Sequence, residues 1–374
     1  MMTDTLAIIW MPKKNNKTML STHYENISIS GLATVLPENK VSVDSYAKVF
    51  GEETVTKFKA MTGVESFYRS DSDQTASDMA YIAARKLIAT QDIDINDIGI
   101  CLFVTQKPDF RVPGPSYIVH RRLGLTANCS CYDINLACSG FVFALNSVSS
   151  MLQHTSKKYA LVLTGDTSHR TMAPEDRTMI MLFGDNGTAT LVERKEENNS
   201  KLFFGLRSQG SKFKSIITPA GAYRNIDAPT KRTEWSDGIS RSDYDTHMKG
   251  MDVFGFSITD VPKLIKDFLA NRNLSPEDID FFALHQPNMY MLKQIARKIK
   301  APMEKMLVSL DRYGNNSSSS IPLVLSDHFG NMRNKRVHIA MCGFGGGLSY
   351  GCADTKISVD GILGVEHSNE TFKA

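Results

Sequence analysis

The stretch that decides the fold is DINLACSGFVFALNSVSSMLQ, residues 133–153. Together with the preceding Cys and Tyr, its first residues, CYDINLA, are predicted to form a strand. From Ser139 onward the apolar residues recur at helical spacing, on one face: Phe141, Leu145, Val148 and Leu152. Cys138 is therefore predicted to lie at a strand-to-helix junction, where Ser139 and Gly140 keep the turn small.

Cys138 is the first candidate for chemistry. At a helix start the unpaired N–H groups and the helix dipole favour a negative charge, which predicts a lowered thiol pKa. A thiolate can accept an acyl group from a thioester. The alternative for a single cysteine is a small apolar side chain that fills a tight buried position.

His285 and Asn315 are the candidate partners of this cysteine. His285 follows the apolar run DIDFFAL and opens HQPN, and Asn315 lies in the polar loop GNNSSSS ahead of Ile321-Pro322, an expected helix start. Each alone is also compatible with a surface histidine or a polar turn. Together, a neutral imidazole and an amide can donate two hydrogen bonds to one thioester oxygen and so stabilise an enolate.

The glycine bend GFGGG, residues 343–347, is the fourth feature. Glycines allow the backbone to approach a reacting group closely, so an N–H from this bend, at Gly346, could join that of Cys138 around an oxyanion. A glycine-rich hairpin bend without chemistry is the alternative. A phosphate loop is excluded because no Lys-Ser/Thr follows.

Two stretches half the chain apart follow the same order of elements. Residues 75–90 and 253–273 both have a helical pattern, and each precedes an acidic turn and an apolar strand. In these turns Asp97-Ile98 corresponds to Asp278-Ile279. We therefore expect a duplicated α/β unit with layered sheets. Further strands are expected in residues 158–166, two in 178–194 and two in 336–357, and a long loop in 218–247.

The bulk composition excludes several classes. A net charge of +3 over 374 residues is too small to indicate nucleic-acid or membrane binding, and no apolar run is long enough to span a bilayer. The six cysteines match neither a disulfide scaffold nor a zinc site, so we expect free thiols, a cytoplasmic location and no metal. Residues 1–21 are expected to be a disordered extension.

The motifs ACSGF, HQPN, GNNS and GFGGG, in this order, resemble β-ketoacyl-acyl-carrier-protein synthase III of the thiolase superfamily, from about residue 25 to 357. The resemblance implies a five-layer α-β-α-β-α fold of two similar halves, 22–196 and 197–357, followed by a tail, 358–374. It also implies a homodimer and no cofactor, with the thioesters of CoA and of the carrier's phosphopantetheine as substrates.

By this resemblance, Cys138 takes an acyl group from acyl-CoA, and malonyl-acyl carrier protein then binds and loses CO2. His285 and Asn315 stabilise the enolate, which attacks the acyl-cysteine, and the N–H groups of Cys138 and Gly346 form the oxyanion hole. The product is a β-ketoacyl thioester on the carrier protein, in fatty-acid or related lipid or polyketide synthesis.

The resemblance also implies substrate-binding and docking residues. Four positions match contacts to CoA or its pantetheine arm: Arg177 in PEDRT, Gly250 and Phe254 in MKGMDVF, and Asn288 in HQPN. Arg297 and Lys298 match basic residues that dock the acidic carrier, although such residues are equally typical of a solvated helix face. Val112 falls where the partner subunit caps the acyl pocket.

Three departures from the family pattern concern substrate delivery. An adenine-stacking tryptophan is replaced near Lys57, a CoA-contacting arginine is replaced by Met61, and a carrier-docking arginine by Tyr290. Together with Val112, which stands where an aromatic is frequent, and the long 218–247 loop, they make acetyl-CoA a doubtful primer. They favour an accessory enzyme with a larger acyl chain or a carrier-bound donor.

Two other readings stay open at this point. Plant-type polyketide synthases share the Cys, His and Asn and a similar GN-x-SS motif, but they lack HQPN. An inactive structural partner of a condensing heterodimer would be expected to lack one of the three residues. The primer, the pathway and the particular carrier protein do not follow from the sequence.

Overall fold

The computed structural model describes residues 19–195 and 200–373, which form two large sheets. The order in the first sheet is β17 (Ile362–His367), β2 (Ile27–Leu36), β8 (Asn186–Arg194), β7 (Tyr159–Asp166), β5 (Ile98–Val104) and β6 (Ser130–Ile134). The order in the second sheet is β1 (Leu20–Glu25), β9 (Lys201–Ser208), β16 (Ser349–Ser358), β15 (Arg336–Gly345) and β14 (Phe281–Leu284).

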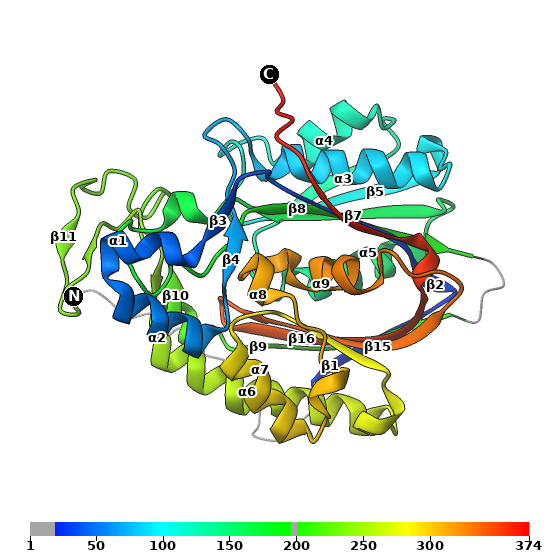
Figure 1. Cartoon of the computed structure of the whole chain (residues 1–374). Coiled ribbons are helices and arrows are strands. Elements are labelled where there is room, and N and C mark those ends of the chain that lie inside the picture. The colour runs from blue at the N-terminus through cyan, green and yellow to red at the C-terminus, as the bar shows by residue number, and fades with distance from the viewer. Residues whose placement is uncertain (1–18, 196–199, 374) are drawn as a thin grey trace, which may run out of the picture.

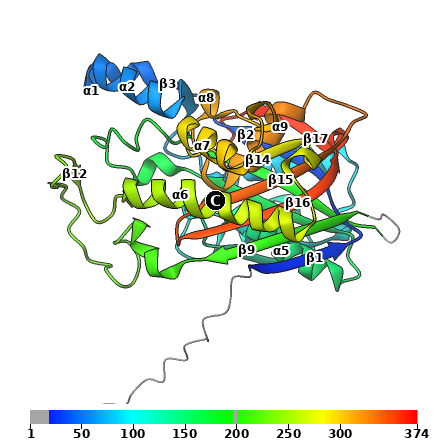
Figure 2. The same ribbon diagram turned by 90° about the horizontal axis from the view of Figure 1, so that it is seen from below.

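Helices complete five layers (Figure 1). Helices α3 (Ala76–Thr90) and α4 (Pro115–Leu123) cover the outer face of the first sheet. Between the sheets lie α5 (Gly140–Gln153) and α9 (Ser320–Phe329), and below the second sheet lie α6 (Gly250–Asn271) and α7 (Met289–Ile299), which Figure 2 shows from underneath. The predicted α-β-α-β-α architecture is confirmed.

The central helices follow from their composition. Helix α5 buries the predicted face, and both α5 and α9 are apolar enough to contact a sheet on each side. Their side chains share one core with strands of both sheets, which suits helices without a solvated face. The outer helix α3 instead keeps one polar face and begins with a capping box in which Thr75 and Asp78 satisfy each other's N–H groups.

The predicted correspondence between the halves is present in the backbone. A 3-10 turn, Ile95–Asp97, leads into β5, and a second one, Pro276–Asp278, leads toward β14. The edge strands cross the boundary between the halves, because β1 pairs with β9 in the second sheet and β17 pairs with β2 in the first. The N-terminal boundary expected at residue 21 falls inside β1, and residues 1–18 of the expected extension lie outside the described residues.

One predicted strand is wrong. Residues 178–194 contain one strand, β8, instead of two. Met179–Leu182 folds into successive turns, in which the N–H of Ile180 donates to Asp176 O and that of Leu182 to Met179 O. These apolar residues are buried without belonging to a sheet. The two strands expected in 336–357 are present as β15 and β16, and the strand expected at 158–166 is β7.

Smaller elements surround this framework. They are β3 (Lys40–Ser42), α1 (Ala47–Phe50), α2 (Glu52–Thr62), β4 (Ser66–Tyr68), β10 (Ile216–Ile217), β11 (Thr233–Glu234), β12 (Ser240–Arg241), β13 (His247–Met248) and α8 (Leu310–Tyr313). The expected long loop 218–247 thus contains only short strand pairs. Within residues 19–195 and 200–373, no helix is both long and apolar enough to cross a membrane.

Candidate active site

Cys138 lies in a tight turn between β6 and α5, which we call the cysteine turn (Asn135–Ser139). Strand β6 ends at Ile134, earlier than the sequence pattern indicates, and α5 begins at Gly140. A side chain at Gly140 would place its Cβ 2.4 Å from Val104 Cγ1, so only glycine lets the helix start this close to β5. The turn places the cysteine at the carboxyl edge of the first sheet.

The glycine bend (Gly343–Gly347) packs directly on the cysteine turn. A Cβ added at Gly345 would lie 2.8 Å from Cys138 Cβ and 3.2 Å from its Sγ, and one at Gly343 would lie 2.9 Å from Cys138 O. The hydroxyls of Ser139 and Ser349 join the two segments at 2.6 Å. The glycines are therefore needed because the end of β15 touches the thiol-bearing turn.

His285 follows β14 and is almost completely buried. The backbone N–H of His285 donates to Cys342 O at 2.9 Å. The ring atom Nδ1 lies 3.1 Å from Ser320 Oγ at the start of α9. The ring meets Phe344 edge-on, with 5.2 Å between ring centroids. Burial lowers the pKa of His285 to about 3, against a weaker opposing effect of a hydrogen bond to the Ser317 backbone, so the imidazole is neutral near neutral pH.

Asn315 is held by what we call the asparagine loop (Gly314–Ser319). Its N–H donates to Leu182 O at 2.8 Å, and Gly314 has a φ of 68°, with no room for a Cβ beside Leu182 O. Asn315 Oδ1 accepts the N–H of Ser317 at 2.9 Å. Since that oxygen is occupied, Nδ2 is the part of the amide that is available to donate to another molecule.

The pKa of the Cys138 thiol is raised to about 12, which contradicts the lowered value expected at a helix start. Burial is the main cause, and the Asp166 carboxylate raises the pKa further, while a hydrogen bond from the Ser317 side chain lowers it. The helix argument was wrong because it ignored desolvation, which penalises the thiolate. The resting thiol is therefore protonated.

Ser317 and Asp166 are site residues that the sequence analysis missed. Ser317 has a φ of 49°, unusual for a residue with a side chain, and its hydroxyl interacts with both Cys138 and Asp166. Asp166 ends β7 and accepts hydrogen bonds from Thr105 Oγ1 and the Gln106 N–H, each at 2.9 Å. A polar residue at the carboxyl end of a buried strand was the signal that could have identified Asp166.

The residues expected to bind CoA or pantetheine lie along α6, α7 and the loop after β7. Asn288 caps α7, accepting the Met291 N–H at 2.8 Å, and Gly250 is the first residue of α6. Phe254 stacks on Tyr290 with 5.9 Å between ring centroids. Arg177 is exposed.

The remaining predicted residues are on the surface. Arg297 is exposed and Lys298 half-buried, both near the end of α7. Val112 is 80 % exposed in the β5–α4 loop. On α2, Met61 is 61 % exposed, and Lys57 pairs with Glu53. Within the part of the chain that the structure describes, no three His, Cys, Asp or Glu side chains are placed to hold a metal ion.

A buried cysteine next to a helix start, in a fold of two similar α/β halves around central helices, is typical of a thiolase-like enzyme. Two family models match the chain: 3-oxoacyl-[acyl-carrier-protein (ACP)] synthase III over residues 132–210, and the C-terminal model of the same name over residues 269–357. The asparagine loop and the glycine bend lie within the second match.

Curated relatives and solved structures agree. The chain is 31 % identical to the β-ketoacyl-[acyl-carrier-protein] synthase III of Clostridium perfringens, over 89 % of this chain and 100 % of that protein. The Fusobacterium nucleatum enzyme of the same name is 30 % identical over 87 % and 97 %. A crystal structure of 3-oxoacyl-(acyl-carrier protein) synthase from Burkholderia xenovorans has a TM-score of 0.88 at 29 % identity, covering 94 % of this chain and 99 % of that one.

The chain therefore belongs to the β-ketoacyl-acyl-carrier-protein synthase III family. It is a condensing acyltransferase of fatty-acid biosynthesis. The recognised family and the predicted enzyme class are confirmed, whereas the roles of individual residues stay predictions.

Proposed function

We propose that Cys138 is the nucleophile that carries the acyl primer between two half-reactions. In the first, its sulfur attacks the carbonyl carbon of an acyl-CoA, the new C–S bond forms, and CoA leaves as a thiol after taking the cysteine's proton. In the second, malonyl-acyl carrier protein loses CO2 and its enolate carbon attacks the acyl-cysteine. The acyl–sulfur bond to Cys138 breaks, a β-ketoacyl-acyl carrier protein leaves, and the cysteine thiolate takes a proton from water to restore the thiol.

The observation that carries this proposal is the convergence of two separate segments on one thiol, with His285 bonded to one of them. The glycine bend comes within van der Waals contact of Cys138, and the asparagine loop reaches it through the Ser317 side chain. His285 hydrogen-bonds the Ser317 backbone of that same loop. A cysteine that only fills space does not need polar groups gathered from β14, α9 and β15 around it.

His285 and Asn315 suit enolate stabilisation because both are neutral donors. With a pKa of about 3, the His285 imidazole has no charge to lose near pH 7 and can donate from one ring nitrogen. Asn315 Nδ2 provides a second donor. Neutral donors aimed at the oxygen where charge develops stabilise an enolate in a site that excludes water.

In this proposal the backbone N–H groups of Cys138 and Gly346 hold the tetrahedral oxyanion. Gly346 follows the strand residue that touches Cys138, and an added Cβ there would be 3.8 Å from Ala137 Cβ. The Cys138 N–H is hydrogen-bonded to its own thiol, which keeps it beside the atom that receives the acyl group. In this proposal it binds the substrate oxygen together with the Gly346 N–H.

The remaining expectations are part of the same proposal. Arg177, Gly250, Phe254 and Asn288 line the path of CoA and pantetheine, Arg297 and Lys298 dock the acidic carrier protein, and Val112 from one subunit caps the partner's acyl pocket in a homodimer. The enzyme acts in the cytoplasm and needs no cofactor besides its thioester substrates. The substitutions at Lys57, Met61 and Tyr290 favour a primer other than acetyl-CoA.

Intact-protein mass spectrometry tests the proposal directly. Wild-type enzyme incubated with a panel of acyl-CoAs is expected to gain the mass of one acyl group, which peptide mapping places on Cys138. Cys138→Ala is expected to gain none and to form no product with malonyl-acyl carrier protein. Cys129→Ala, another buried cysteine, is the matched control. Product formation by Cys138→Ala would favour a structural-partner role instead.

A further inference from the structure

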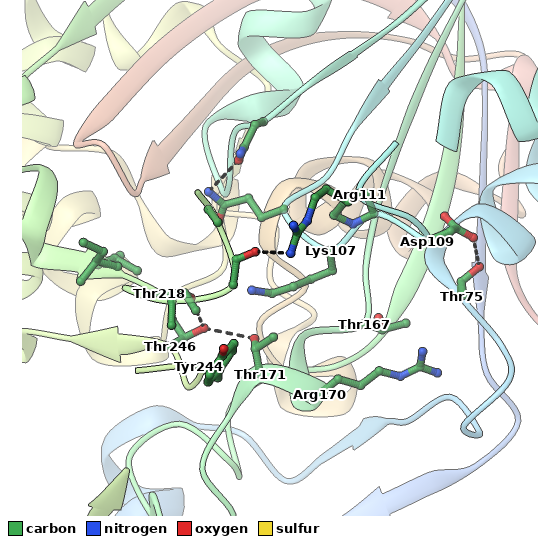
Figure 3. Close-up of a pocket in the computed structure, with 18 residues that line it drawn as sticks. Thr75, Lys107, Asp109, Arg111, Thr167, Arg170, Thr171, Thr218, Tyr244 and Thr246 are labelled. Carbon is green, nitrogen blue, oxygen red and sulfur yellow. Dashed lines mark hydrogen bonds between the residues drawn. The ribbon is translucent and has the colours of Figure 1, made fainter. Parts of the chain in front are cut away.

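A polar pocket of about 660 Å³ opens beside the cysteine turn (Figure 3). It is formed by the segments that follow β5 and β7, by Asn135 of the cysteine turn, and by the loop that begins at Ile216. The carboxyl ends of parallel strands are where α/β proteins collect ligands. None of the site residues expected from the sequence lines this pocket.

Three contacts connect the pocket to Cys138. Asn135 belongs to the same turn and accepts a hydrogen bond from Gln106 Nε2 at 3.3 Å. An added Cβ at Gly346 would lie 3.9 Å from Ile216 Cβ, so the glycine bend borders the pocket wall. Asp166, next to the lining residue Thr167, interacts electrostatically with both the Cys138 thiol and Lys107. The pocket is thus adjacent to the thiol.

Lys107 is the unusual residue of this pocket. Its side chain extends into the space between Thr246 and Arg170 in Figure 3, and among the described residues its ammonium forms no ion pair and no hydrogen bond. Partial burial lowers its pKa against the opposing effect of the Asp166 carboxylate, so the surroundings compensate the charge only in part. A half-buried ammonium without a close partner is stabilised by an anion that pairs with it.

The other charged residues of the pocket have hydrogen-bond partners, although Asp109 Oδ2 has none among the described residues. The guanidinium of Arg170 donates to the carbonyls of Asp71 and Gln74, each at 2.6 Å. Arg111 donates to Gly221 O at 2.9 Å, and Asp109 accepts from Thr75 Oγ1 and Ser77 Oγ. Lys107 is therefore the charge that is available to a ligand, and the lining has an excess of cations.

The geometry points to an acyl pocket for primers that end in a carboxylate, with Lys107 as the group that pairs with it. This rests on the proposed acyl-Cys138 intermediate. Ile216, Ile217 and Ala220 offer apolar wall to the methylene groups, and Thr167, Thr171 and Thr246 offer hydroxyls near the charged end. The matching substrate class is the half-thioester of a dicarboxylic acid, for which succinyl-CoA and glutaryl-CoA are probes.

A competing explanation is that Lys107 serves only to balance the buried Asp166. Asp166 accepts two hydrogen bonds at one oxygen and interacts with Ser317, and it has no ion pair within 4.0 Å among the residues described. If Lys107 acted only through Asp166, its removal would disturb Cys138 equally for every acyl group. Selectivity between acyl groups separates the two explanations.

The test is competition for Cys138. Wild-type enzyme receives equal amounts of glutaryl-CoA and hexanoyl-CoA, chains of similar reach that differ in the charge at the tip, and intact mass gives the ratio of the two adducts. A charge-assisted hydrogen bond is worth enough to predict a glutaryl preference of about tenfold or more. Lys107→Met is expected to lower the ratio about tenfold or more, and Lys107→Arg to keep most of it.

Lys40→Met, an exposed lysine on β3, is the matched control and should keep the wild-type ratio. The proposal is overturned if wild type prefers hexanoyl-CoA, or if Lys107→Met leaves the ratio unchanged while total labelling falls. If neither thioester nor acetyl-CoA labels Cys138, the acyl-cysteine step itself fails. Labelling by neutral acyl groups alone leaves that step intact and removes only the dicarboxylate assignment.

Discussion

The residues on the two sides of Cys138 differ in their charge and in how fully that charge is paired. On the side of His285 and Asn315, the groups are buried, neutral and fixed by hydrogen bonds to the backbone of neighbouring segments. On the side of Lys107, charged residues gather around an open pocket, and one ammonium has no partner among the described residues. The first side has its polar groups paired within the chain, whereas the second holds an ammonium that a carboxylate-ended primer would pair with under the inference above.

This difference separates chemistry from selection. Decarboxylation needs donors that do not change with pH and do not bind the carboxylate that must leave as CO2. A neutral histidine and an amide meet both conditions, whereas a cation would hold the malonyl carboxylate in place. Primer choice instead benefits from a charge, because a buried unpaired group rejects the wrong partner strongly. Four experiments test this division between catalysis and primer selection.

The largest effect is expected from Asn315→Ala. Loss of one preorganised donor typically costs on the order of 10²–10³ in rate, so condensation by enzyme already acylated at Cys138 should fall by about that factor. Acylation itself should persist, because Asn315 acts on the later enolate. Single-turnover assays with malonyl-acyl carrier protein measure the first effect, and intact mass the second. Asn128→Ala, on the surface, is the control, and an equal loss of acylation would contradict the division.

The two half-reactions should respond differently to pH. With its pKa raised to about 12, Cys138 is mostly protonated, so its thiolate fraction rises as pH rises. Acylation should accelerate about tenfold per pH unit, or about 100-fold between roughly pH 6 and 8. Condensation by pre-acylated enzyme should show no histidine titration in that range, because His285, with a pKa of about 3, is already neutral. A plateau in acylation near neutral pH would show that a substrate or residue activates the thiol.

Gly345→Ala tests the contact between the glycine bend and the thiol. The added Cβ would lie 2.8 Å from Cys138 Cβ, which forces either the bend or the cysteine turn to move. Overpacking of this kind costs about 1–3 kcal/mol, and acylation is expected to slow about tenfold or more if the shift falls on the thiol. Gly255→Ala, where a Cβ meets nothing within 4 Å, is the control for stopped-flow acylation. Acylation of Gly345→Ala at the wild-type rate would mean that the glycine bend can move away from Cys138 without disturbing the thiol.

The smallest effect is expected from a change at Met61, on the exposed surface of α2. Met61→Arg adds a cation to an exposed position of α2, and an exposed ion pair contributes only about 0.2–1 kcal/mol. Acylation by acetyl-CoA at low concentration should therefore improve by a few-fold at most. Acylation by an acetyl thioester of N-acetylcysteamine, which lacks the nucleotide, should not change. An equal gain with both substrates would place the effect away from the CoA nucleotide.

Much of this arrangement could be predicted because it depends on local patterns. The apolar periodicity after Ser139, the acidic turns at Asp97 and Asp278, and the placement of His285 after a buried strand all correspond to structure. These signals survive because a strand or helix that is buried must repeat its apolar residues at a fixed spacing.

The rest depends on contacts between distant segments. The apolar run Met179–Leu182 has the composition of a strand, but Leu182 O is used by Asn315, and the run folds into turns beneath the asparagine loop. The pKa of Cys138 follows from desolvation, which no spacing of residues reports. In the sequence, nothing distinguishes Lys107 from an ordinary loop residue. In the fold, the loops after β5 and β7 and the segment at Ile216 surround it.

The two halves of the chain exchange edge strands, as two subunits do in a domain-swapped dimer. Strand β1, at the start of the first half, completes the second sheet, and β17, in the tail after the second half, completes the first. A fragment of residues 22–196 would expose the β2 edge, and a fragment of 197–357 would expose the edge of β9. During synthesis, the β2 edge therefore stays unpaired until β17 has been made. In that interval a chaperone or a neighbouring nascent chain can bind to this open edge.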